Sequence, residues 1–157
     1  MNRDQPFRDA GRHKPPQNVV ITSHQPTILF VTVGTERRVP WLLRPSIHKH
    51  LVQAWQSAGA WIIGYYMLMP DHVHFFCAPY DQRFTVEQWV TFWKRQFRRI
   101  HKDPTCEWQA HSFHHRLRNQ DNYAERWRYV QENPVRAGLA TEPENWPHQG
   151  MLNTLRW

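Results

Sequence analysis

Residues 26–147 are predicted to form one α+β domain with a ferredoxin-like antiparallel sheet. The first observation is the order of apolar segments: strand, helix, strand, strand, helix, strand, and then one extra helix. The second is the length of 157 residues, which suits a single hydrophobic core. We expect two helices to cover one face of the sheet, with the extra helix, which carries Tyr129, across the other.

The first strand and the first helix are indicated by composition and spacing. Residues 28–33 read Ile-Leu-Phe-Val-Thr-Val, a continuous apolar run of strand length that Gly34 ends. Over residues 46–58 apolar side chains recur at helical spacing, with Ser46 as a candidate N-cap and Gly59 as a stop signal.

Residues 61–68 and 72–77 are rich in aromatic and β-branched side chains and form a predicted β-hairpin. Pro70 and Asp71 supply its turn, because proline cannot donate to a sheet ladder and aspartate favours turns.

The second strand of this hairpin carries two histidines, His72 and His74, separated by Val73. Side chains alternate along a strand, so both imidazoles point to one face, roughly 6–7 Å apart at the backbone. Two rings at that separation can reach one metal ion at about 2.0–2.1 Å per bond. A solvated, idle pair fits the same pattern, so a partner elsewhere in the chain must decide.

The next helix begins at Thr85, where Gln88 completes a capping box. Its apolar stripe comprises Val86, Trp89, Val90, Trp93, Phe97 and Ile100. Basic residues off the stripe are predicted to contact DNA phosphates, and a merely solvated face is the alternative. They are Lys94, Arg95, Arg98 and Arg99, and the predicted DNA-binding set also includes Arg126.

A fourth strand is predicted over residues 112–118, and a last helix starts at the Asn122/Glu125 cap signal and ends near Asn133. Its apolar face comprises Tyr123, Trp127 and Val130. Tyr129 is about 100° from Val130 and so lies off that face, on nearly the same side as Asn133 one turn later.

The composition points to a polyanionic partner. The formal net charge is +7, and aromatic residues, nine of them Trp, make up 14% of the chain and can stack on bases. The sequence shows no apolar run long enough for a membrane span, no apolar signal core and only two cysteines. We therefore expect a reduced, cytoplasmic protein without membrane association. Residues 1–25 are interpreted as a mobile basic arm, and the chain after Leu139 as loop-like, with Trp146-Pro147 docking onto the body and residues 148–157 as a C-terminal tail.

Four segments carry a resemblance to a known family. The Met69–His74 hexapeptide resembles the HUH signature of single-tyrosine transposases. Trp108-Gln109, the segment 116–118 and the Tyr129–Leu139 stretch, which contains Asn-Pro-Val, resemble the REP-associated tyrosine transposases. The similarity spans residues 26–147.

This resemblance implies a metal-dependent enzyme that cleaves and rejoins single-stranded DNA near palindromic hairpin repeats. Tyr129 would be the nucleophile and form a 5′-phosphotyrosine, with Mg²⁺ or Mn²⁺ held by His72 and His74 and no small-molecule cofactor. The residue types suit this chemistry, because a cation neutralises phosphate charge and a phenol needs activation before it can attack. Whether the protein is a monomer or a homodimer stays open.

Asn133 is the predicted third metal ligand, since its amide oxygen would tie the metal to the helix that carries Tyr129. The resemblance supports this choice, because relatives among the insertion-sequence transposases have a glutamine ligand four residues after the tyrosine. The alternative is that Asn133 only caps the helix end before Pro134. Rival ligands are His111, His114 and His115.

Two other functions fit the same residues. One is a non-cleaving protein of this fold that binds DNA or RNA hairpins through its basic and aromatic side chains. The other is a metal-dependent hydrolase in which Tyr129 only orients an attacking water.

Overall fold

A computed structural model describes residues 27–156, apart from the side chain of Asp121. The predicted basic arm over residues 1–25 lies outside the described residues. The elements in chain order are β1 (Leu29–Thr35), the 3₁₀ turn η1 (Glu36–Arg38), α1 (Ile47–Ser57), β2 (Trp61–Leu68), β3 (His72–Pro79), α2 (Val86–His101), β4 (Trp108–Arg116), α3 (Gln120–Gln131), α4 (Asn133–Arg136), η2 (Pro143–Asn145) and β5 (Gln149–Met151).

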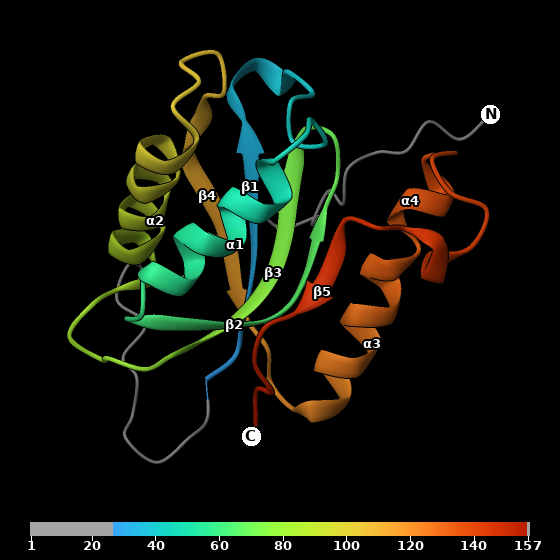
Figure 1. The fold of residues 1–157 in the computed structure, drawn as a ribbon. Coiled ribbons are helices and arrows are strands. Elements are labelled where there is room, and N and C mark those ends of the chain that lie inside the picture. Colours follow the sequence, from blue (N-terminus) through green and yellow to red (C-terminus); the bar gives the residue numbers. More distant parts are fainter. Residues whose placement is uncertain (1–26, 157) are drawn as a thin grey trace.

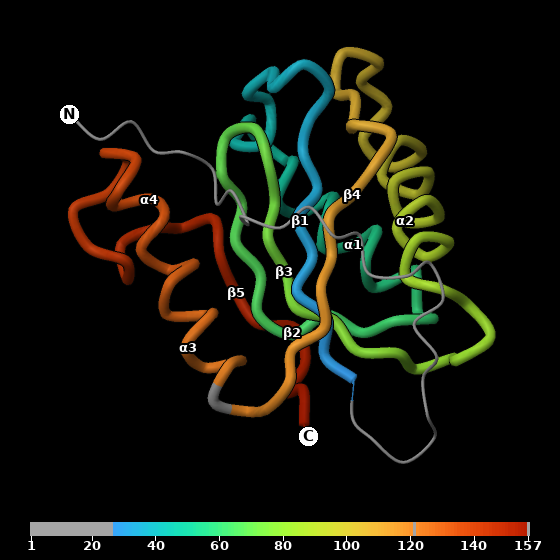
Figure 2. Tube along the Cα trace, turned by 180° about the vertical axis from the view of Figure 1, so that it is seen from behind, coloured from blue at the N-terminus to red at the C-terminus, as the bar shows by residue number. Residues whose placement is uncertain are grey.

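The five strands form one antiparallel sheet in the order β4-β1-β3-β2-β5. Helices α1 and α2 lie on one side of it and α3 on the other (Figure 1). Seen from the opposite side, α1 and α2 are behind the strands (Figure 2). The prediction of a ferredoxin-like α+β fold with the extra helix on the second face is confirmed.

Alternation along β3 divides the core into two faces. We call the side occupied by Val73, Phe75 and Cys77 the first face; it packs on α1 and α2. It contains the buried tryptophans Trp41, Trp55, Trp61, Trp89, Trp93 and Trp108. The large apolar area of these rings makes this layer the main hydrophobic core.

The second face is the side of β3 that carries His72, His74 and Phe76. Helix α3 packs there through its predicted apolar side chains, Tyr123, Trp127 and Val130, in a smaller cluster with Phe30, Met67 and Phe76. Trp127 stacks on Tyr65 of β2, with ring centroids 4.6 Å apart and an interplanar angle of 13°. This packing holds α3 against the sheet.

Helix ends depend on side chains that periodicity alone does not reveal. Thr85 and Gln88 form the predicted capping box of α2. Helix α3 begins earlier than predicted, because Asn119 is the N-cap and its Oδ1 accepts from the backbone N–H of Asn122 at 2.9 Å. Ser46 stands at the N-cap position of α1 but makes no side-chain capping bond.

The prediction of a loop-like tail is wrong for Gln149–Met151, which pairs as β5 with Tyr65–Met67 of β2. Leu155 is buried in the second-face cluster, and the Trp146 indole N–H donates to the backbone oxygen of Leu68 at 2.9 Å. A three-residue strand is too short to show a sequence period. Among the residues the structure describes, no helix is long and apolar enough to cross a membrane.

Candidate active site

The two histidines of β3 lie side by side on the second face. Their ring centroids are 4.7 Å apart, with the rings at 76° to each other. Both side chains are half-buried. The predicted shared face of His72 and His74 is therefore observed, with Val73 pointing into the opposite core.

Each imidazole is oriented through the same ring nitrogen. Nδ1 of His72 lies 2.7 Å from Oδ1 of Asp71, and Nδ1 of His74 lies 2.7 Å from Oγ1 of Thr32. Metal-binding histidines usually use their second nitrogen in this way, on a carboxylate or another polar group. Nε2 is therefore the atom through which either ring would bind a metal.

The surroundings of His74 favour the neutral form of its imidazole. Burial holds the pKa of His74 well below its usual value, and positive charge from His72, Arg126, Arg136 and Arg38 lowers it further. Only the neutral form of imidazole can ligate a metal. Thr32, Arg38 and Arg136 were not assigned to the site from the sequence, because their proximity to His74 depends on strand pairing and on the packing of distant segments.

Tyr129 lies on the outer side of α3, and 46% of its surface is exposed. The guanidinium carbon of Arg136 is 4.2 Å from the centre of the Tyr129 ring. Nη2 of Arg136 also donates to the Tyr129 backbone oxygen at 2.9 Å and to Oδ1 of Asn133. Because Arg136 also lowers the pKa of His74, it links the tyrosine to the histidine side of the sheet.

Asn133 does not end α3. That helix ends at Gln131, and Asn133 opens the short helix α4. Its amide oxygen accepts a hydrogen bond from Arg136, so a metal bound to that oxygen would lie beside the positive guanidinium.

The predicted basic residues divide between the two faces. Arg95, Arg98 and Arg99 are exposed on α2, which packs on the first face, across the sheet from His72 and His74.

The half-buried Arg126 lies on the second face. Its guanidinium carbon is 5.4 Å from the centre of the Phe30 ring, which itself stacks on His74 at 5.3 Å.

Lys94 was predicted to contact phosphate from an exposed position, and the structure corrects this, because its side chain is buried. It shares a helical row with Val90 and Phe97, four positions before and three after, so it turns inward. Its Nζ donates to the backbone oxygen of Gln109 at 2.8 Å, and burial, together with Arg98, lowers its pKa to about 8.

The three rival ligands differ in position. His114 points to the first face, where its Nε2 is 3.3 Å from Oε1 of Glu87. His115 packs against Phe30 on the second face, and His111 is exposed. Strand alternation therefore removes His114 from the vicinity of the histidine pair.

Comparison with solved structures shows which known proteins share this fold. A REP-associated tyrosine transposase bound to a REP hairpin superimposes with a TM-score of 0.67 at 22% sequence identity, over 78% of this chain and 75% of that one. This chain has the fold of a REP-associated tyrosine transposase. The expected resemblance is thus confirmed at the level of the fold.

A second structure, a protein described as a transposase from Deinococcus radiodurans R1, has a TM-score of 0.51 at 16% identity. That alignment covers 69% of this chain and 91% of the other. Neither a protein-family model nor a curated protein matches the sequence.

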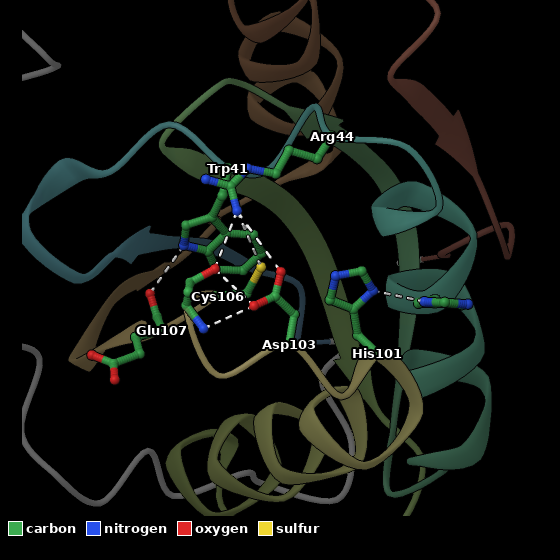
Figure 3. A network of polar contacts seen from close by, with 8 residues as sticks. Trp41, Arg44, His101, Asp103, Cys106 and Glu107 are labelled. Carbon is green, nitrogen blue, oxygen red and sulfur yellow. Dashed lines mark hydrogen bonds and ion pairs between the residues drawn. The ribbon is translucent and has the colours of Figure 1, made fainter.

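A second group of side chains that could hold a metal lies at the end of α2 and in the turn that leads to β4 (Figure 3). One ligand atom from each of His101, Asp103 and Cys106 falls within 4.8 Å of the others. Sequence reasoning missed this group, although the spacing His-x-Asp-x-x-Cys was a usable signal.

Proposed function

We propose that this protein is a single-tyrosine transposase that cleaves and rejoins single-stranded DNA beside hairpin repeats. The observation that carries the proposal is the histidine pair, oriented through both Nδ1 atoms, on the face of the sheet that α3, the helix containing Tyr129, packs against. The REP hairpin bound to the similar transposase supports a DNA hairpin as partner.

In the proposed reaction, the Tyr129 hydroxyl oxygen attacks the scissile phosphorus. The new bond links the tyrosine to the 5′-phosphate, and the bond from phosphorus to the 3′ oxygen breaks. The phenol gives up its proton, and the departing 3′ oxygen gains one. Because the phosphodiester energy is kept in the phosphotyrosine, a 3′-OH can later reseal the strand without ATP.

The side chains around the tyrosine suit a phosphodiester substrate. Arg136 contacts Tyr129 directly, and both Arg126 and Arg136 act electrostatically on His74. Their positive charge would attract a phosphate to this part of the second face.

His72, His74 and Asn133 are the residues proposed to hold a divalent cation, Mg²⁺ or Mn²⁺. Two imidazoles with their Nδ1 atoms already bonded fit this role, and an amide oxygen suits a hard cation. Such an ion would neutralise charge on the non-bridging phosphate oxygens.

The deciding experiment is a denaturing gel with an end-labelled single-stranded DNA hairpin, read for a covalent protein–DNA adduct. Wild-type protein should form the adduct, and Tyr129→Phe should lose both adduct and cleavage while keeping its hairpin affinity. Tyr123→Phe is the matched control on the same helix and should retain activity, because Tyr123 is a buried packing residue.

Adduct formation by Tyr129→Phe would contradict the assignment of the nucleophile. Cut DNA without an adduct would instead indicate a metal-dependent hydrolase.

A hairpin-binding protein without cleavage is the second candidate function. The observation in its favour is the bond between Arg136 and Asn133, which puts a positive guanidinium against the amide oxygen proposed for the metal. Intact DNA with tight hairpin binding in the same gel and in a shift assay would support this candidate.

A further inference from the structure

The side chains of His101, Asp103 and Cys106 lie together at the end of α2, in a cluster that the proposed transposase chemistry does not use. We propose that this turn cluster is a zinc site, separate from the histidine pair on β3. Thiolate sulfur, imidazole nitrogen and carboxylate oxygen are the usual protein ligands of Zn²⁺. One such atom from each residue already lies within 4.8 Å of the others.

The orientation of His101 is set by a fourth residue, His50 of α1. Nδ1 of His50 is 2.9 Å from Nδ1 of His101, so this contact occupies the Nδ1 atom of the His101 ring. The opposite edge of that ring faces Asp103 and Cys106 (Figure 3). This leaves Nε2 as the metal ligand, with His50 as a positioning residue that fixes the ring.

The other two ligands are held by a tight turn. Oδ1 of Asp103 accepts from the backbone N–H of Thr105 at 2.9 Å and from its hydroxyl at 2.7 Å. The backbone N–H of Cys106 donates to the Asp103 carbonyl at 3.1 Å. These bonds fix the turn that brings the Cys106 side chain, only 2% exposed, next to the carboxylate.

A positive group already lies against these two ligands. Nη1 of Arg44 is 3.9 Å from Oδ2 of Asp103 and 4.0 Å from Sγ of Cys106. The Arg44 side chain is 47% exposed, so it can turn towards solvent and leave its place to a cation.

Only small movements separate this arrangement from a bound state. Zinc bonds of about 2.0–2.3 Å in a tetrahedron put ligand atoms about 3.5 Å apart, which side-chain rotations can reach. The thiol proton is released as the Cys106–zinc bond forms, and water can take the fourth position. A bound ion would tie the α2–β4 turn together and stabilise the folded state by mass action.

The test uses the full chain, freed of metal, in a His72→Ala/His74→Ala background that removes the proposed catalytic ligands. Titration with Co²⁺ should produce a thiolate-to-cobalt charge-transfer band, and added Zn²⁺ should displace it. Cys106→Ala should lose the band, whereas Cys77→Ala, a change at the other buried cysteine, should keep it.

Two further variants separate ligation from a structural role of the turn. His50→Ala should weaken Zn²⁺ binding about 10–100-fold, the usual loss when a partner of a ligating histidine is removed. Arg44→Gln should strengthen Zn²⁺ binding, because it removes the competing positive charge and leaves the ligands in place.

The proposal is overturned if the chain gives no thiolate band, if Cys77 supplies it, or if His50→Ala binds Zn²⁺ as tightly as its parent. Circular dichroism of each variant separates loss of a ligand from loss of the fold, and Arg44→Gln measures Zn²⁺ affinity with both cysteines in place. The outcome does not depend on strand cleavage, because the background already lacks the histidine pair.

Discussion

The two faces of the sheet are built from the same strands and serve different purposes. On β3, Val73, Phe75 and Cys77 enter an aromatic core closed by α1 and α2, whereas His72 and His74 enter a half-open site beside α3. A shift of one residue in strand register would exchange the two sets. The apolar face thus fixes the register that holds the histidines in position.

This comparison indicates that stability and chemistry should respond to different substitutions. Changes at the buried tryptophans of the first face remove packing without touching the histidine pair or Tyr129. Changes at the polar groups of the second face remove candidate ligands while leaving the larger core intact. The predictions below test that separation, from the largest expected effect to the smallest.

Removing one proposed ligand should have the largest effect. We expect His74→Ala to lower the rate of DNA cleavage by more than about 100-fold, since even the partners of metal ligands contribute about 10–100-fold. EDTA should have the same effect on the wild-type enzyme. Cleavage is measured as adduct yield against time, and full activity in EDTA would exclude a metal-dependent reaction.

Thr32→Val tests the same histidine with a smaller expected loss of cleavage than His74→Ala. It keeps the strand and its volume but removes the hydroxyl that contacts Nδ1 of His74 at 2.7 Å. The expected loss of cleavage is about 10–100-fold, with little change in unfolding. Cleavage at the wild-type rate would mean that this contact does not position the ring.

Truncating the first-face core should act on stability. Trp93 is fully buried, so Trp93→Ala should lower the free energy of unfolding by about 3–5 kcal/mol. Phe113→Ala is the control on β4, where the ring is 69% exposed, and should change it by less than about 0.5 kcal/mol. Urea denaturation followed by circular dichroism measures both, and equal losses would argue against a dominant first-face core.

The basic surface of α2 should affect the affinity for DNA and the salt dependence of that affinity. If Arg95 and Arg98 each contact a phosphate, replacing both with Ala should flatten the slope of log affinity against log salt by about 1.4. Lys94→Met should leave the slope unchanged, because Lys94 is buried and bonded to Gln109. An unchanged slope in the double variant would assign this surface to solvent alone.

Lowering the pH from 7.5 to 5.5 should have the smallest effect, a modest loss of stability of the folded state. Burial lowers the pKa of His74, His48 and His114 below the usual 6.5, so the unfolded chain takes up protons first as the pH falls. Their contribution to stability is therefore present above pH 6.5 and decreases below it. Urea midpoints at pH 7.5 and 5.5 should show lower stability at the acidic value, and a higher midpoint there would contradict this sign.

The sequence alone determined the features that depend on local periodicity. Alternation placed His72 and His74 on one face, and helical spacing identified the buried apolar residues of α2 and α3 and left Tyr129 outside the core. These properties follow from the 2.0- and 3.6-residue periods of strands and helices, which neighbouring residues fix.

The tertiary structure decided where distant segments meet. It placed Arg95 and Arg98 across the sheet from the histidine pair, buried Lys94 against Gln109, and added β5 to the edge of the sheet. It also brought His50 of α1 to His101 at the end of α2, completing a cluster that sequence spacing only partly shows. Such contacts join residues far apart in the chain, and only the packing of whole elements specifies which of them touch.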